Sequence, residues 1–312
     1  MRKAWAYAPG HLTGLFQICD QSMDPLLRGS RGSGLSITQG VHTRVAAEPA
    51  DETSYTIYFN DEPTDGAFVS ENVLGKMLPR ADQPYSMEVR HTIETPLGAG
   101  FGSSGGGAFS LALALNEALS LGLSDTEAAR LAHVAEIECK TGLGTVFAAT
   151  VGGFGVLYQP GAPGIGAAVS YEGSEDVRVV YVCFGPISTK EALSNTELRA
   201  RINEIGGGYV DELHKEFTPK RFMRFSRQFT EHVGLVTPRL RRLFDAMDSE
   251  GVTFTMAMFG EVAFTVQPRD DAEDVANLVR SKSLGAEPVV CDVDARCAAV
   301  MRKLSAPILF FI

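Results

Sequence analysis

A glycine-rich segment, PLGAGFGSSGGG at residues 96–107, constrains this chain more than any other feature. It follows a predicted strand at 85–93 and opens a predicted helix at 104–121. Glycines at alternate positions leave main-chain N–H groups open to an anion, and a helix start adds a favourable dipole. The segment therefore predicts a phosphate-binding loop, although it matches neither GxxxxGK[ST] nor GxGxxG. The residues assigned to it are Pro96, Leu97, Gly98, Ala99, Gly100, Phe101, Gly102, Ser103 and Ser104.

A second helix is expected to start at a capping box, Ser124 to Glu127, and to end at Gly142 in the left-handed conformation. Spacings of three and four residues place His133, Glu136 and Lys140 on one face of it. Glu136 would then bind a metal while His133 faces a substrate. The alternative is a solvated face on which Glu136 pairs with Lys140. The glycine clusters that follow favour the first interpretation.

Two polar segments near the N-terminus, 9–14 and 28–34, are predicted to be flexible loops. In the second, Arg28 and Arg31 would bind a carboxylate in bidentate fashion, with Ser30 and Ser33 as hydroxyl partners. The alternative is an exposed turn without a ligand.

The charge balance narrows the classes of partner. There are 28 basic and 38 acidic side chains, which give a formal net charge of −10. This acidity disfavours nucleic acid and anionic membranes, which both need clustered Lys and Arg. No apolar run reaches the length of a membrane span, and five scattered cysteines suit a reducing compartment. A cytoplasmic protein with small-molecule partners is expected.

Strands and helices alternate along the chain, which favours an α+β fold. Periodicity lapses in the Pro- and Gly-rich stretch 159–166, and we place a domain boundary near residue 170. The predicted domains are 1–170, which contains the phosphate-binding loop, and 171–312.

Three motifs, APGHLTGLF at 8–16, PLGAGFGSSGGG at 96–107 and TMAMFGEVAF at 255–264, resemble those of the GHMP kinase superfamily in order and spacing. Within it the chain is most similar to the archaeal pantoate kinases, through DPLLRGSRGSG at 24–34, AHVAE at 132–136 and TGLG at 141–144. The resemblance implies a two-lobed fold, with a ribosomal S5 domain 2-like N-terminal lobe and a ferredoxin-like C-terminal lobe. It also implies a homodimer.

The resemblance implies a kinase that uses ATP and Mg²⁺ to phosphorylate pantoate to 4-phosphopantoate in coenzyme A biosynthesis. Loop 97–104 would wrap the ATP phosphates, and Ser104 with Glu136 would hold Mg²⁺. Ser30, His11 and His133 would contact pantoate, and Ser104, Glu136 and His133 would be the catalytic residues.

The sequence departs from the superfamily pattern at two positions. His11 stands where many members have Lys, although a His there suits pantoate kinases. The catalytic aspartate is expected beside TGLG, where this chain has Thr145. Phosphoryl transfer tolerates a missing base, because it depends mainly on positioning and electrostatics. The alternatives are a kinase acting on mevalonate, homoserine or a sugar, and a nucleotide-binding sensor without activity.

Overall fold

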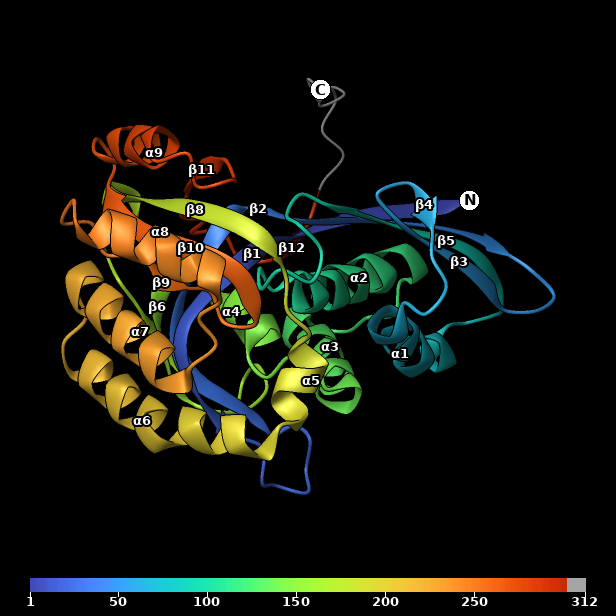
Figure 1. The fold of residues 1–312 in the computed structure, drawn as a ribbon. Helices are drawn as coiled ribbons and strands as arrows, with labels where there is room; N and C mark the ends of the chain where they lie inside the picture. The colour runs from blue at the N-terminus through green and yellow to red at the C-terminus, as the bar shows by residue number, and fades with distance from the viewer. Residues whose placement is uncertain (302–312) are drawn as a thin grey trace.

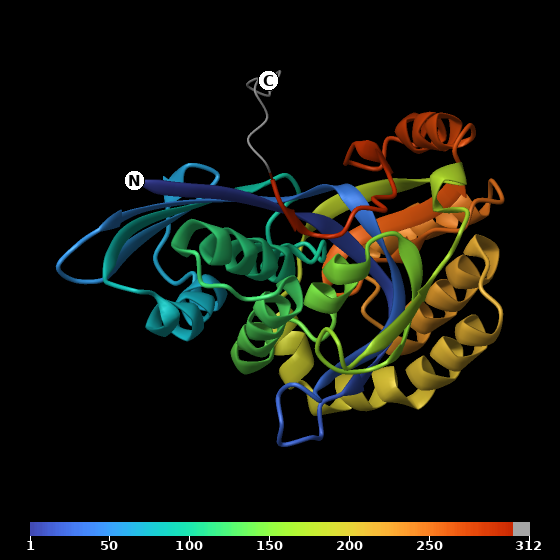
Figure 2. The same cartoon turned by 180° about the vertical axis from the view of Figure 1, so that it is seen from behind.

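The computed structural model describes residues 1–301 and contains two β-sheets (Figure 1). The first sheet has the order β12-β1-β2-β5-β3-β4, and β6 pairs with both β2 and β7. Its strands are β1 (Arg2–Cys19), β2 (Gly29–Pro49), β3 (Ser54–Phe59), β4 (Glu62–Pro63), β5 (Tyr85–Ile93), β6 (Phe154–Gln159), β7 (Ala167–Ser170) and β12 (Ala299–Val300). Helices α1 (Phe68–Met77), α2 (Ser103–Leu119) and α3 (Asp125–Cys139) lie together on one face of its long strands, and α4 (Thr145–Val151) follows (Figures 1 and 2).

The second sheet has the order β11-β8-β10-β9. Its strands are β8 (Val177–Pro186), β9 (Thr255–Met256), β10 (Gly260–Pro268) and β11 (Pro288–Asp292). Four helices fill the connection from β8 to β9: α5 (Thr189–Ser194), α6 (Thr196–Lys215), α7 (Pro219–Val233) and α8 (Pro238–Asp248); α9 (Ala272–Ser281) joins β10 to β11. Within residues 1–301, none of the helices combines the length and the apolar character that crossing a bilayer requires.

The prediction of two flexible loops near the N-terminus is wrong. Residues 9–14 belong to β1 and residues 29–34 to β2, with Arg28 just before the strand, and the two strands pair from Arg2↔Ala47 to Cys19↔Gly29. Their glycines reflect close approach between neighbouring groups, because a Cβ at Gly34 would lie 2.4 Å from the Leu12 carbonyl oxygen. Glycine here therefore indicates a crowded strand.

Both predicted helices of the first half are present. The capping box is confirmed: the Ser124 side chain accepts from Glu127 N–H, and the Glu127 carboxylate accepts from Ser124 N–H. The predicted end of this helix is corrected. It ends at Cys139, and the left-handed residue is Lys140, with φ of 58°. Lys140 ends the helix before the glycine is reached.

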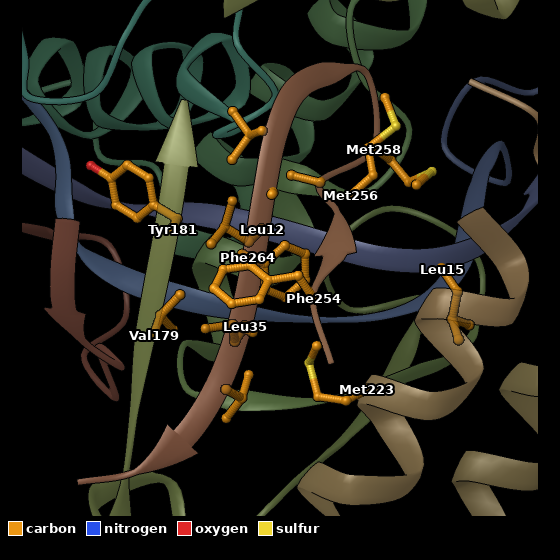
Figure 3. Close-up of a cluster of buried hydrophobic side chains, with 14 of the residues drawn as sticks. Leu12, Leu15, Leu35, Val179, Tyr181, Met223, Phe254, Met256, Met258 and Phe264 are labelled. Carbon is orange, nitrogen blue, oxygen red and sulfur yellow. The ribbon is translucent and has the colours of Figure 1, made fainter. Parts of the chain in front are cut away.

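One hydrophobic cluster joins the long hairpin to the second sheet. Leu12 and Leu35 come from β1 and β2, and they pack with Val179 of β8 and Phe264 of β10 (Figure 3). The predicted boundary near residue 170 falls between β7 and β8, and the chain returns to the first sheet at β12. The division into 1–170 and 171–312 stays a prediction, and residues 302–312 lie outside the described part.

Candidate active site

The glycine-rich segment forms the turn between β5 and α2. Gly98, Gly100 and Gly102 have positive φ angles of 70°, 84° and 68°, a region that residues with a Cβ rarely adopt. Gly102 is the N-cap residue of α2 and has no side chain with which to cap it. The first N–H groups of α2 are therefore available to an anion at the positive end of the helix.

Contacts from distant parts of the chain hold this loop. The N–H of His11 donates to the Phe101 carbonyl oxygen over 2.8 Å. At the start of β10, a Cβ on Gly260 would lie 1.8 Å from the Ala99 carbonyl oxygen. The three motifs that carry the resemblance therefore meet at the loop.

Glu136 on α3 lies next to the start of α2 and is only 2% exposed. The Ser104 side chain lies beside its carboxylate, and the Thr141 hydroxyl lies 3.5 Å from Oε1. Burial raises the pKa of Glu136 to about 7, although these two hydroxyls act in the opposite direction. A Cβ at Gly105 or Gly142 would lie 2.5 Å from a carboxylate oxygen of Glu136. Both glycines therefore make room for this carboxylate.

The donor set of Ser104 and Glu136 fits a magnesium ion. Mg²⁺ prefers hard oxygen ligands and usually keeps waters and substrate phosphates in its coordination shell. In the part of the chain that the structure describes, no three or more His, Cys, Asp or Glu side chains cluster as a metal site. A cation here would therefore combine one carboxylate and hydroxyls with phosphate oxygens and water.

A cavity of about 150 Å³ lies beside the phosphate-binding loop. It is lined by β1, β2, β6, β7, α4, α5 and the turn before β10, and its polar lining includes His11, Thr13, Ser30, Ser36, Thr145 and Thr189. Among the described residues, no Asp, Glu, Lys or Arg lines this cavity. Hydroxyls, main-chain groups and one imidazole therefore provide its polarity.

His11 on β1 is that imidazole. Burial lowers its pKa to about 4, so the ring is neutral near pH 7. Its Nδ1 is buried and has no hydrogen-bond partner within residues 1–301. A Cβ at Gly34 would lie 2.6 Å from its Nε2, so the opposite strand accepts this ring only because it carries glycine there. A neutral imidazole of this kind can exchange hydrogen bonds with a small polar molecule.

Ser30 and Thr145 both line the cavity, and Thr145 also contacts the loop at Gly102. Ser30 is 8% exposed, and a Cβ at Gly144 would lie 2.6 Å from its hydroxyl oxygen. Thr145 packs on α2, because a Cβ at Gly102 would lie 2.6 Å from its Cγ2 and one at Gly105 would lie 2.7 Å from its Cβ. Thr145 therefore stands between loop and cavity, where the resemblance predicts a carboxylate.

His133 is not part of the cavity lining. It is 2% exposed, and its Nε2 lies 3.0 Å from the Arg28 carbonyl oxygen. Burial lowers the pKa of His133 below its usual range, although this hydrogen bond acts in the opposite direction. In this structure the ring holds the main chain that leads into Ser30. Its predicted contact with substrate stays a prediction.

The structure does not bring the guanidinium groups of Arg28 and Arg31 to the cavity. Arg31 donates to the Asp211 carboxylate and to the Gln17 side chain, both over 2.8 Å. Arg28 donates to the Ser22 carbonyl oxygen. Alternate residues of a strand point to opposite faces, so Ser30 and Arg31 cannot serve the same pocket.

Thr13 and Ser36 line the cavity but were missed by the sequence analysis. The sequence did contain a signal for them. His11 and Thr13 share one face of β1, and Ser30 and Ser36 share one face of β2. Interpreting these segments as loops removed that alternation from consideration.

Comparisons with known proteins show the family of the chain. Residues 68–153 match the model of the GHMP kinases N terminal domain. The chain is 34% identical to the pantoate kinase of Thermococcus kodakarensis, over 89% of this chain and 92% of that one. It is 30% identical to the pantoate kinase of Methanocaldococcus jannaschii, over 92% and 99%. A solved structure described as a phosphotransferase related to the CoA biosynthesis pathway superposes with a TM-score of 0.86, at 30% identity over 96% of this chain and 99% of that one. The chain therefore belongs to the pantoate kinase family of GHMP kinases.

Proposed function

We propose that this protein transfers the γ-phosphoryl group of ATP to the 4-hydroxyl of pantoate, which yields 4-phosphopantoate for coenzyme A biosynthesis. The observation that carries the proposal is the meeting of three features at one place. The loop at the start of α2, the Ser104–Glu136 pair and the neutral cavity adjoin one another. The curated relatives do not favour the other small alcohols, mevalonate, homoserine or a sugar.

The phosphate chain of ATP would lie along residues 97–104. The main-chain N–H groups at the start of α2 would bind its oxygens, supported by the helix dipole. Ser104 and Glu136 would hold Mg²⁺, which neutralises phosphate charge when bound. The buried Glu136 carboxylate supports this assignment, because a cation would favour its ionised form.

Pantoate would occupy the cavity, with Ser30 and His11 as its polar contacts and His133 supporting Ser30 from behind. Because neither Arg28 nor Arg31 lines the cavity, its carboxylate would be bound by hydroxyl and main-chain N–H groups. This mode of binding replaces the prediction from sequence alone, in which the two arginines bind the carboxylate.

The reaction would proceed without an aspartate base. Thr145 has no basic group, and His11 is the one titratable side chain in the described lining. Phosphoryl transfer passes through a loose transition state, in which positioning and charge stabilisation matter more than activation of the nucleophile. The pocket residues would therefore orient the hydroxyl, and solvent would take up its proton.

ADP release with Mg-ATP, measured across pantoate, mevalonate, homoserine and simple sugars, tests the proposal. Turnover that depends on pantoate, with 4-phosphopantoate identified by mass, is the expected result. ATP binding without turnover on any of these alcohols would contradict it and support a sensor. The homodimer and the cytoplasmic location also stay proposals, and sedimentation of the purified chain tests the first.

A further inference from the structure

Between β11 and β12 the chain crosses from the second sheet to the first. We call residues 293–298 of this crossing the C-terminal strap. In Figure 2 it is the red segment that runs across the blue strands of the first sheet close to the green helix α4. It contacts Ile37 of β2 through an isolated bridge from Val293.

Main-chain hydrogen bonds tie the strap to two residues of the cavity lining. Asp294 N–H donates to the Ser36 carbonyl oxygen over 2.9 Å, and Gly153 N–H donates to the Asp294 carbonyl oxygen over 2.7 Å. Ser36 N–H donates to the Gly153 carbonyl oxygen over 2.8 Å and closes a ring of three residues. Ser36 and Gly153 both line the cavity, whereas Asp294 does not.

The Asp294 side chain fixes the shape of the strap. It is 3% exposed, and it accepts from the Tyr7 hydroxyl over 2.7 Å. The Arg296 guanidinium donates to both carboxylate oxygens, over 2.8 and 2.9 Å, and Arg296 N–H donates over 3.0 Å. A buried carboxylate that accepts this many hydrogen bonds is held in one position, because moving it would break them.

The strap also supports α4. Ala298 N–H donates to the Ala149 carbonyl oxygen over 2.8 Å. A Cβ at Gly152, which has φ of 68°, would lie 2.7 Å from the Arg296 carbonyl oxygen. A helix of seven residues has little stability of its own and depends on its surroundings. The strap therefore holds the helix that begins at Thr145.

We propose that Asp294 is a positioning residue of the phosphoryl-transfer site: it holds Ser36, Gly153 and α4 in the arrangement that shapes the acceptor cavity. It touches neither acceptor nor nucleotide. The inference rests on the proposed function for its kinetic consequences. The loop at the start of α2 is held by other contacts. Loss of the Asp294 carboxylate should therefore weaken binding of the acceptor far more than binding of ATP.

Asp292 provides a matched control. It lies two residues earlier, and its carboxylate accepts from Arg178 and Arg269 over 2.9 and 2.8 Å. None of these three residues lines the cavity. Asp292→Asn therefore removes two ion pairs at the end of β11, just before the strap, without touching the ring of Ser36, Gly153 and Asp294.

Steady-state kinetics of Asp294→Asn, measured with the full-length chain, test the proposal. The KM for pantoate should rise at least about tenfold, while kcat and the KM for ATP change less than about threefold. Asp292→Asn should leave all three constants within about twofold. An unchanged KM for pantoate, an equal rise in the KM for ATP, or an equal effect of Asp292→Asn would overturn it.

Amide hydrogen exchange separates failure of this inference from failure of the proposed function. Residues 145–153 should exchange faster in Asp294→Asn than in the wild type or in Asp292→Asn. This readout needs no substrate, so it also decides the case in which the wild type does not phosphorylate pantoate. Equal exchange in all three proteins would overturn the inference. If Asp294→Asn does not fold, Tyr7→Phe removes one donor to the same carboxylate, and the same outcomes apply.

Discussion

The Ser104 side chain, at the start of α2, lies beside the Glu136 carboxylate of α3, and a Cβ on the next residue, Gly105, would lie 2.5 Å from Glu136 Oε2. The contact places an acidic oxygen beside the N–H groups at the start of α2, where an anion would bind. The Glu136 carboxylate and a bound phosphate are both negative and would repel each other. The arrangement therefore suits a cation that lies between carboxylate and phosphate.

Replacing either residue should therefore impair turnover. We expect Glu136→Gln and Ser104→Ala each to lower kcat by about 100-fold or more, because both would weaken the stabilisation of phosphate charge. Glu138→Gln is the control, since Glu138 is on the same helix but pairs with Lys76 at the surface. Titration of kcat with Mg²⁺ is the measurement, and wild-type rates in both site variants would reject the assignment.

The space around Glu136 gives a second prediction. Gly105→Ala places a Cβ 2.5 Å from Glu136 Oε2 and 2.7 Å from Thr145 Cβ, so activity should fall about tenfold or more and stability should fall by about 1 to 3 kcal/mol. Gly208→Ala, within α6, meets nothing within 4 Å and should stabilise the protein by up to about 1 kcal/mol. Urea unfolding compares the two, and equal effects would contradict the packing described here.

Thr145 tests the mechanism without an aspartate base. Thr145→Val keeps the branched side chain against α2 and replaces the hydroxyl with a methyl group, so kcat should stay within about threefold of the wild type. A fall of about 100-fold in a folded Thr145→Val protein would show instead that this hydroxyl takes part in the reaction.

His91 should make stability depend on pH. Its Nδ1 lies 2.8 Å from Thr43 Oγ1 and its Nε2 lies 3.2 Å from Ser70 Oγ, and burial lowers its pKa from 6.5 to about 4. Between these values the unfolded chain binds a proton that the folded chain does not. The free energy of unfolding should therefore fall as the pH drops through this window, by up to about 2 kcal/mol at about pH 5.

Urea unfolding of the wild type and of His91→Gln, repeated across this range, measures the effect. The replaced side chain no longer titrates in this range, whereas the other buried histidines, such as His11, still do, so the stability of the variant should vary less with pH than that of the wild type. Parallel curves for the two proteins would show that His91 does not contribute.

Much of the site follows from local sequence. The glycines of 96–107 predict a turn with positive φ at a helix start, because both properties depend on a few neighbouring residues, and the structure has both. The three-residue spacing of His133 and Glu136 places them on one helix face, but the structure gives them different surroundings. Glu136 meets Ser104 from α2, and His133 meets the Arg28 carbonyl oxygen.

The interpretation of Arg31 shows where such reasoning stops. An Arg among Gly and Ser residues is expected to be exposed and free to bind a ligand. In the structure it forms an ion pair with Asp211, which lies 180 residues away in the chain. Strand pairing decides which face each side chain takes, and pairing between distant segments has no local signal. The same holds for Asp294, whose partner Tyr7 lies 287 positions earlier in the chain.

The sequence by itself determined the α+β class, the family resemblance, the glycine-rich turn at the start of a helix and the capping box, because these depend on short-range periodicity, glycine conformation and motif spacing. Tertiary structure alone decided that the N-terminal segments are paired strands and that no charged side chain of the described chain lines the cavity. It also decided that the C-terminal strap is hydrogen-bonded to two residues of the cavity lining, Ser36 and Gly153. Those features arise from packing between segments far apart in sequence, where burial and close approach select the partners.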